Sequence, residues 1–544
     1  MPEFKLRGHV VDIVGRRTYP GEVTVIDGHI AAIEPVDGAV EGYILPGFID
    51  AHVHVESSML IPSEFARLAV VHGTVATISD PHEIGNVLGV EGVEFMIANG
   101  REVPFHFFFG APSCVPATTF ETAGACIDAA EVGRLLERPE VVYLSEMMNF
   151  PGVLGGDPEV LAKIAHAKRL GKPVDGHAPG LRGDAAVRYI QAGMSTDHEC
   201  FTAEEALEKL AHGMWIQIRE GSAAKNFEAL HPLLHEHWER MMFCSDDKHP
   251  DSLVLGHLNT ICARAVAAGV DVFKVLQVAC LNPIEHYKLP VGRMRIGDPA
   301  DMIVVDDLVG FITRQTYIQG RLVAEDGASH IERVPSSTPN KFNCTTKTPE
   351  DFRVPAAEDD LLVIEPYDGQ LITGKVTMRP TLRDGACVPD PDRGLLKIAV
   401  VNRYAEAPVA VGWITNLGLH KGALASCVAH DSHNIVAVGA NDDDLCAAVN
   451  AVILAKGGIS LADGSLRMSL PLPVAGIMSD GDAYSVAHDY SAIDLAAKGL
   501  GCTLSAPFMT LSFMALLVIP HLKMSDLGLF DGDTFGFVHG KASA

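Results

Sequence analysis

The feature that most constrains the fold is a repeated alternation of short apolar runs with helical patterns between Tyr43 and Leu289. The apolar runs, each expected to form a strand, are Tyr43–Val55, Thr74–Ser79, Phe105–Phe109, Val141–Leu144, Pro173–Val174, Met194–Thr196, Trp215–Ile218 and Met241–Cys244. Helical patterns lie between these runs, for example at Pro158–Leu170, Ala203–His212 and His257–Ala268. Eight strands alternating with helices over about 250 residues have the size and order of a (β/α)8 barrel. The sequence therefore predicts an α/β protein built around a TIM-like barrel over residues 45–289.

Both flanks of the predicted barrel have a β pattern. Residues 1–44 contain two β-rich runs, Val23–Ile26 and Ile30–Ile33, and Asp27-Gly28 between them is a strong hairpin signal. Residues 290–334 return to the β pattern after the barrel. We expect the two flanks to form one small composite β-sandwich.

The rest of the chain is expected to be a C-terminal α+β domain over residues 341–544, reached through a Pro/Ser-rich linker. Its clearest helix is predicted at 444–456, where apolar residues recur at helical spacing behind an acidic start. Gly457-Gly458 is expected to end that helix.

Composition limits the partners of this chain. With 42 Lys and Arg against 69 Asp and Glu, the net charge of −27 repels nucleic-acid phosphates and anionic membranes. The start of the chain lacks a signal-peptide core, and the most apolar stretch, 507–520, is shorter than a membrane span. The 11 cysteines include no Cys-x-x-Cys pair, as is typical of reduced thiols. We expect a cytoplasmic protein without nucleic-acid or membrane partners, and the large second domain favours a homo-oligomer, a dimer or higher.

Polar residues follow nearly every predicted strand. In chain order they are His52 and His54, Asp80 and His82, Ser113-Cys114, Glu146, His177, His198, Arg219-Glu220 and Asp246-Asp247. Side chains alternate along a strand, so His52 and His54 point to the same side. Because the carboxyl ends of barrel strands carry the active site, these side chains are expected to meet in one place.

Four imidazoles and two carboxylates of this set suit two divalent ions. His52, His54 and Asp246 would hold one ion, and His177 with His198 the other. Glu146 could bridge the two ions, because its carboxylate offers two oxygens and a negative charge. A water between two ions becomes a nucleophile near neutral pH, and Asp246 could accept its proton and pass it to a leaving group. Asp247 competes with Asp246 for the eighth-strand position, and we favour Asp246.

Other candidates have a second interpretation each. Asp80 and His82 are predicted to bind substrate or to move protons, although Asp-Pro is also turn chemistry. Glu56 and Ser57 are predicted to contact substrate or to orient the histidines, and a serine here, Ser57 or Ser58, equally suits a helix cap. Glu83 and Glu199 are expected to be structural or solvated.

One segment of the expected C-terminal domain has three alternative interpretations. His430-Asp431-Ser432-His433 could form a further metal site, could reach over the barrel mouth into the substrate pocket, or could be a polar turn. The nearby runs Met478-Ser479-Asp480 and Phe508–Met514 are expected to be core rather than pocket.

These stretches resemble a known family. PGFIDAHVH and GDPADMIVVD are similar to the amidohydrolase superfamily, and the wider set of blocks is similar to bacterial adenine deaminases. The blocks are DAHVHVESSM, SDPHEIGNV, GAPSCVPAT, LSEMMNFPGV, DGHAPGL, DHE, IREGSAAKN, FCSDDKHP, AHDSHNIVAVG, LPLPVAGIMSD and PFMTLSFMALLVIP, spread between residues 11 and 530.

The resemblance implies hydrolytic deamination of adenine to hypoxanthine and ammonia by a metal-bound hydroxide that attacks purine C6. It implies that His52, His54, Glu146, His177, His198 and Asp246 are the metal ligands, with Glu146 in the bridging place. Manganese is the expected metal, and Fe(II) or Zn is compatible with the same donors. Two alternatives stay open: the same centre acting on another aminopurine, such as an N6-substituted adenine, or on a cyclic amide, and a non-catalytic scaffold. A scaffold would have lost metal ligands, and all six positions hold competent residues.

Overall fold

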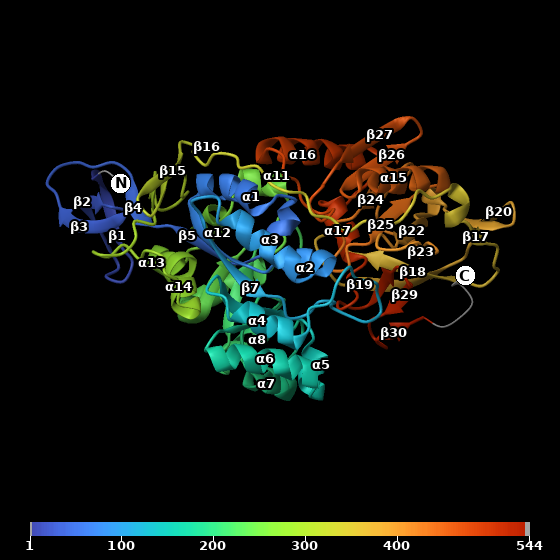
Figure 1. The fold of residues 1–544 in the computed structure, drawn as a ribbon, viewed down its shortest axis with the longest axis horizontal. Helices are drawn as coiled ribbons and strands as arrows, with labels where there is room; N and C mark the ends of the chain where they lie inside the picture. Colours follow the sequence, from blue (N-terminus) through green and yellow to red (C-terminus); the bar gives the residue numbers. More distant parts are fainter. Residues whose placement is uncertain (1–2, 539–544) are drawn as a thin grey trace.

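The computed structural model describes residues 3–538 and has a parallel eight-stranded sheet at its centre (Figure 1). Its strands are β5 (Phe48–Val53), β6 (Thr74–Ser79), β7 (His106–Ala111), β8 (Val141–Met147), β9 (Val174–Gly176), β10 (Met194–Asp197), β11 (Trp215–Arg219) and β12 (Met241–Cys244). They pair in sequence order, each parallel to the next. The last strand returns to the first, since Val53 forms a parallel bridge with Asp246 and the Asp246 N–H donates to His52 O. The sheet is therefore consistent with the predicted TIM barrel.

Helices follow the strands and cover the outside of this sheet. The longer ones are α1 (Pro62–Ala69), α2 (His82–Leu88), α3 (Val90–Gly100), α4 (Ala129–Leu136), α6 (Pro158–Leu170), α7 (Gly183–Ala192), α8 (Ala203–Ala211) and α12 (Leu258–Ala267). Shorter ones are α5 (Phe150–Gly155), α9 (Phe227–Leu230), α10 (Leu234–His237), α11 (Pro250–Leu255), α13 (Val272–Leu276) and α14 (Asn282–Tyr287). The predicted helices at 158–170, 203–212 and 257–268 are present to within one residue.

The first predicted strand is two strands. Residues 43–46 form β4 in the flanking sheet, and β5 starts at Phe48 in the barrel. Gly47 separates them, and a Cβ at this position would lie 2.3 Å from the Val75 side chain. The chain thus changes sheets where β6 leaves no room for a side chain, a close approach that an apolar run does not reveal.

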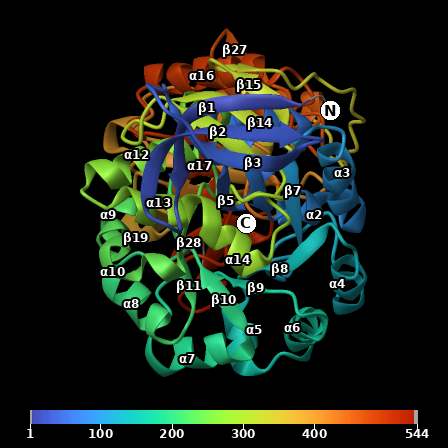
Figure 2. The same cartoon turned by 90° about the vertical axis from the view of Figure 1, so that its left-hand side faces the viewer.

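The two flanks combine into one sheet of eight strands (Figure 2). Its order is β16 (Ala328–Ser329), β15 (Arg321–Glu325), β14 (Thr313–Ile318), β13 (Met302–Val305), β4 (Tyr43–Pro46), β1 (Phe4–Asp12), β2 (Arg17–Ile26) and β3 (His29–Pro35). The predicted hairpin is present: Asp27 and Gly28 have φ of 49° and 80° between β2 and β3. Strands from both flanks pair in this one sheet.

A third eight-stranded sheet dominates the C-terminal region, drawn in yellow to red in Figure 1. Its order is β19 (Thr373–Met378), β18 (Leu361–Pro366), β23 (Ala410–Ile414), β22 (Leu396–Val401), β25 (Ile435–Gly439), β24 (Ala423–Ser426), β26 (Ile459–Asp463) and β27 (Leu466–Leu470). Two three-stranded sheets accompany it: β17 (Val354–Pro355), β21 (Ala386–Val388) and β20 (Thr381–Arg383), and β28 (Leu522–Ser525), β29 (Gly528–Asp531) and β30 (Gly536–Phe537).

Three helices complete this region: α15 (Asp442–Ala455), α16 (Ala483–Gly499) and α17 (Pro507–Phe513). The predicted helix at 444–456 is α15, which begins two residues earlier because Asn441 caps it by accepting from the Asp444 N–H. It ends at Lys456 in the left-handed conformation, just before the two glycines.

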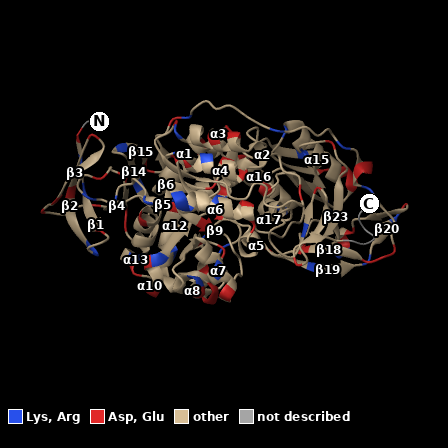
Figure 3. Cartoon of the chain, turned by 60° about the horizontal axis from the view of Figure 1, so that its bottom comes forward, with Lys and Arg blue, Asp and Glu red and all other residues tan. Residues whose placement is uncertain are grey.

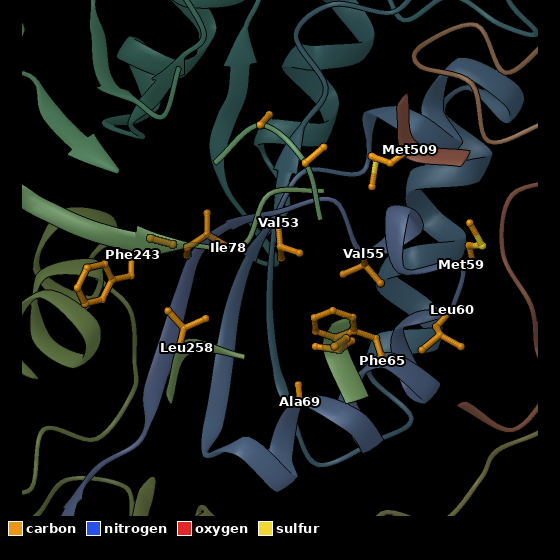
Figure 4. Close-up of a cluster of buried hydrophobic side chains, with 14 of the residues drawn as sticks. Val53, Val55, Met59, Leu60, Phe65, Ala69, Ile78, Phe243, Leu258 and Met509 are labelled. Carbon is orange, nitrogen blue, oxygen red and sulfur yellow. The ribbon is translucent and has the colours of Figure 1, made fainter. Parts of the chain in front are cut away.

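One hydrophobic core runs from the barrel into the C-terminal region. Figure 4 shows Met509 of α17 in the same cluster as Val55, Met59 and Phe65 of the barrel. Main-chain bonds join the two parts as well, since the Ser479 N–H donates to Met59 O and the Ile61 N–H to Ser479 O. The C-terminal region is therefore packed directly on the segment that follows β5.

Acidic and basic positions are both spread along the chain (Figure 3), and the acidic residues are in excess, which gives the net charge of −27. Among the residues described, none of the helices has the length and apolar character needed to cross a bilayer.

Candidate metal centre

Six side chains meet at the carboxyl ends of the barrel strands, as the sequence predicts. They are His52 in β5, His54 after it, Glu146 in β8, His177 after β9, His198 after β10 and Asp246 after β12. Each has a relative exposure of 6% or less. The barrel therefore assembles four imidazoles and two carboxylates from five strands in one place sealed from solvent.

Glu146 lies at the centre of this cluster. Its Oε2 atom is 2.8 Å from His177 Nδ1 and 3.1 Å from His198 Nε2, and its Oε1 atom is 3.4 Å from His54 Nε2. One carboxylate thus touches imidazoles from both halves of the predicted ligand set, as a bridging group would.

Asp246 lies on the side of the first-strand histidines. Its Oδ1 atom is 3.4 Å from His52 Nε2 and 3.2 Å from His54 Nε2. Asp247, the competing residue, points elsewhere and accepts a 2.5 Å hydrogen bond from Ser57 Oγ. The arrangement favours Asp246 as the residue that shares a cation with His52 and His54.

The donor set fits divalent cations. The Nε2 atoms of His52 and His54 are only 3.2 Å apart, and both face carboxylate oxygens. Groups of three or more donors that could hold an ion include His52 with His54 and Asp246, His52 with Glu146 and His198, and His177 with His198 and Glu199. Nitrogen and oxygen donors from neutral imidazole and carboxylate suit first-row divalent metals. A cation would also relieve the crowding of lone pairs between these rings.

The charges of the cluster depend on one another. Burial disfavours ionisation of Glu146, but His177 and its neighbours hold the pKa of Glu146 well below its usual range. Burial likewise opposes ionisation of Asp246, and the nearby Arg219 guanidinium holds its pKa well below normal. Burial tends to lower the pKa of His54, but the hydrogen bonds to Asp246 and Glu146 outweigh it and raise that pKa well above its ordinary value. Both carboxylates are therefore anionic, the form that binds a cation.

The sequence did not reveal the roles of Arg219 and Glu199. Arg219 is fully buried and donates to Asp246 Oδ2 at 2.8 Å, to Glu199 Oε2 at 3.1 Å and to the Ala224 carbonyl at 2.7 Å. Glu199, expected to be structural or solvated, is buried beside His177 and His198. The sequence feature that could have indicated these roles is that both residues lie at the ends of predicted barrel strands.

The second-strand candidates border the same cluster. His82 is buried, with Nδ1 3.2 Å from Asp80 Oδ2 and 3.5 Å from Glu146 Oε1. Neither of its ring nitrogens has a hydrogen-bond partner among the described residues. His82 is thus placed to interact with a ligand, while Asp80 accepts a hydrogen bond from the His82 main-chain N–H at 3.1 Å.

Glu56 and Ser57 lie behind the cluster, and the described pocket-lining residues include neither of them. Glu56 is buried, accepts from the Ile84 N–H at 3.2 Å, and has its pKa raised to about 7 by that burial. Ser57 supports Asp247, and Ser58 donates to Val55 O. These hydrogen bonds join the segment to Ile84, Asp247 and Val55 rather than to His52 or His54.

Glu83, expected to be structural or solvated, is buried. It is 1% exposed and binds two histidines of the C-terminal region, His430 through Nδ1 and His433 through Nε2, the latter at 2.5 Å. The segment at 430–433 therefore contains a buried polar turn that packs against helix α2 of the barrel.

A pocket of about 320 Å³ opens beside the cluster. Its walls come from both parts of the chain: His54, His82, Glu83, Glu146, Met148, His177, His198, Glu199, Arg219, Asp246 and Asp247 from the barrel, and Leu371, His430, Asp431, Phe513 and Leu516 from the C-terminal region. Phe513, from the run expected to be core rather than pocket, belongs to the hydrophobic core and also lines the pocket. Met478 and Met509 are core, as expected.

Lys523 ties two walls of this pocket together. Its buried ammonium donates to the Leu371 carbonyl at 2.6 Å and to the Phe513 carbonyl at 3.0 Å. Burial lowers the pKa of Lys523 to about 7.

The stability of the fold is expected to depend on pH through Lys523. The unfolded chain binds the lysine proton up to its normal pKa of 10.5, whereas the folded chain releases it near 7. The penalty for burying this lysine is therefore complete below pH 7 and is lost as the pH rises toward 10.5, so stability increases with pH in this window. Relative to Lys523→Met, the wild-type protein should gain about 3 kcal/mol between pH ~7 and pH ~10 in urea unfolding. Lys421→Met, at a lysine that is 61% exposed, is the control and should show a flat difference.

Comparison with known proteins adds family information to this geometry. Residues 43–323 match the model of the amidohydrolase family, and residues 370–536 match the model of the adenine deaminase C-terminal domain. The chain is 58% identical over 537 residues to an adenine deaminase of Salinibacter ruber, with 98% of each chain covered. It is 53% identical to an adenine deaminase of Sulfurovum sp. over 98% of this chain and 99% of that one, and 50% identical to one of Methanosarcina acetivorans with the same coverage.

Proposed function

This chain belongs to the adenine deaminase family of amidohydrolases, and we propose on this premise that it hydrolyses adenine to hypoxanthine and ammonia. The observation that carries the proposal is the buried cluster of four imidazoles and two carboxylates beside a pocket that both parts of the chain line.

We propose two divalent ions per chain, with manganese as the metal and Fe(II) or Zn as compatible replacements. His52, His54 and Asp246 would hold one ion, His177 and His198 the other, and Glu146 would contact both. When bound, the metal supplies Lewis acidity, which makes a water nucleophilic near neutral pH.

The chain's own residues would bind the substrate and move protons. Asp246 would accept a proton from the attacking water and return it to the departing amino group, since it is anionic and lines the pocket. Arg219 holds that carboxylate in place through Oδ2, which leaves Oδ1 directed at the histidines. His82, with two unpartnered ring nitrogens, would hydrogen-bond the substrate near its reacting carbon.

We also propose the chain's organisation: a composite flank of residues 1–44 and 290–334, a catalytic barrel over 45–289, and a C-terminal α+β domain over 341–544. The cytoplasm is the proposed location, because all 11 cysteines are free thiols, 10 of them buried. A homo-oligomer is proposed for the assembly.

Metal removal and substrate choice test the function. The protein is stripped with a chelator, reloaded with Mn²⁺, and assayed for ammonia release from adenine, N6-methyladenine, guanine and cytosine. We expect the stripped protein to be inactive, the reloaded protein to turn over adenine, and the other bases to react at least ~10²-fold more slowly. Preference for N6-methyladenine would support the alternative substrate. Failure on every base with metal bound would refute the proposal and favour a scaffold.

A further inference from the structure

We propose that His430 and Asp431 bind the edge of adenine that lies opposite its amino-bearing carbon, His430 donating to N3 and Asp431 accepting from N9–H. The C-terminal region would then select the free base and reject purines substituted at N9. This inference rests on the proposed function and assigns specificity residues to it.

Both residues are buried with polar atoms left unpaired at the pocket. His430 and Asp431 are 2% and 3% exposed and line the pocket. Within residues 3–538, His430 Nε2 and Asp431 Oδ2 have no hydrogen-bond partner. Leaving a buried polar atom unpaired costs about 1–3 kcal/mol, so such atoms are normally satisfied by a ligand or by water. An adjacent donor and acceptor of this kind match a ligand edge that has an acceptor beside a donor.

Glu83 fixes the orientation of His430. Its carboxylate accepts from Nδ1, so the ring presents Nε2 to the pocket. Burial opposes protonation, but the charges of Glu83 and Asp247 raise the pKa of His430 to about 9, so both nitrogens carry protons near neutral pH. His430 Nε2 therefore donates, and Glu83 acts as a positioning residue through this ring.

The position of His430 and Asp431 relative to the metal centre determines which edge of the substrate they can contact. His82 lies between the centre and the C-terminal segment, with Nδ1 3.5 Å from Glu146 and Nε2 3.7 Å from Asp431. Asp431 and Glu146 thus contact opposite ends of one imidazole ring, so the distance between them spans that ring and both contacts. In adenine, N3 lies directly across the six-membered ring from C6, and N9–H lies beside N3. With C6 at the centre, the N3/N9 edge faces away from it, where an acceptor–donor pair meets His430 and Asp431.

The other walls contributed by the C-terminal region suit the faces of a flat base. Phe513 stacks on the His430 ring with a centroid distance of 5.3 Å and an interplanar angle of 29°. Leu371 and Leu516 add apolar surface to the same pocket. A nucleoside carries a sugar at N9 in place of the hydrogen, so it would lose the bond to Asp431 and would have to displace these walls.

Ring-deaza analogues test the two contacts separately. Mn-loaded wild-type, His430→Ala and Asp431→Ala proteins are assayed on adenine, 3-deazaadenine and 9-deazaadenine. For wild type we expect kcat/KM to fall about 10- to 100-fold when the matching nitrogen is removed, the range for a hydrogen bond to a charged group. Asp431→Ala should lose a similar factor on adenine and show no further penalty for 9-deazaadenine, and His430→Ala should behave likewise with 3-deazaadenine. Comparing penalties between proteins cancels the intrinsic reactivity of each analogue.

Binding of hypoxanthine, which keeps N3 and N9–H, supplies a readout apart from turnover. Its calorimetric Kd should rise about 10-fold or more in both variants while the metal content stays at the wild-type value. His420→Ala and Asp443→Ala, at exposed positions of the same region, are matched controls that should change nothing. If Asp431→Ala does not fold, Asp431→Leu, which also has no hydrogen-bond acceptor, replaces it in the same comparison.

Variants that retain the full analogue penalty, or that bind hypoxanthine as wild type does, would overturn this inference alone. A wild-type protein that does not deaminate adenine would overturn both this inference and the proposed function.

Discussion

Glu146→Gln is expected to abolish tight metal binding and with it nearly all turnover of adenine. The carboxylate is 3% exposed, anionic, and within 3.4 Å of imidazole nitrogens of His54, His177 and His198. Glutamine removes the charge and turns an NH₂ group toward at least one of these rings. Replacing a residue that only supports a metal ligand lowers metal affinity or activity about 10- to 100-fold. Replacing Glu146, the shared ligand, should therefore lower metal affinity and activity by more than ~100-fold. The measurements are metal per chain after dialysis and kcat/KM on adenine.

The matched control is Glu137→Gln, at an exposed position just past helix α4. It should keep both metal content and activity. Two ions still bound to the Glu146→Gln protein would show that the bridging place is misassigned, even if activity is lost.

The architecture of the barrel follows from features visible along the chain. A strand such as Met241–Cys244 is entirely apolar because it is buried on both faces, and a run of this kind bounded by polar residues can be located from the sequence. The boundary between β4 and β5 could not be located in this way, because residues 43–49 form one apolar run that continues from the flanking sheet into the barrel. Only the contact between Gly47 and Val75 reveals where the chain crosses from one sheet to the other.

The metal centre could be predicted for a related reason. Parallel strands deliver their carboxyl ends to one edge, so residues that follow successive strands, such as His177 and His198, must be neighbours without any knowledge of side-chain packing. The strand order supplies this information, and the strand order can be read from the alternation of strands and helices.

The strand order does not predict which residues of the C-terminal region line the pocket. Glu83 and His430 are 347 positions apart, and no pattern in either segment indicates that α2 packs against the turn before β25. Phe513 is apolar at helical spacing, which predicts burial but not the cavity it borders. Arg219 posed the same difficulty, because a charged residue after a strand is expected to be solvated unless its partners, Glu199 and Asp246, are known.

Asp246→Asn is expected to lower kcat by about 10²- to 10⁴-fold, the range for loss of a group that transfers protons. Asparagine has nearly the same shape, so the bond to Arg219 and the contacts to His52 and His54 can persist. What it lacks is the negative charge that accepts a proton from water and the capacity to return it to the leaving amine. The loss should fall mainly on kcat rather than KM, at metal contents brought to the wild-type value with excess Mn²⁺.

Asp247→Asn is the comparison that makes this test decisive, because the two residues are adjacent and both line the pocket. Asp247 accepts from Ser57 and lies 3.8 Å from His430, away from the first-strand histidines. Its replacement should therefore leave metal content unchanged and reduce kcat by much less than Asp246→Asn. If Asp247→Asn instead showed the larger loss of kcat and of metal, then Asp247 would be the eighth-strand ligand, and the proton transfer would have to be reassigned with it.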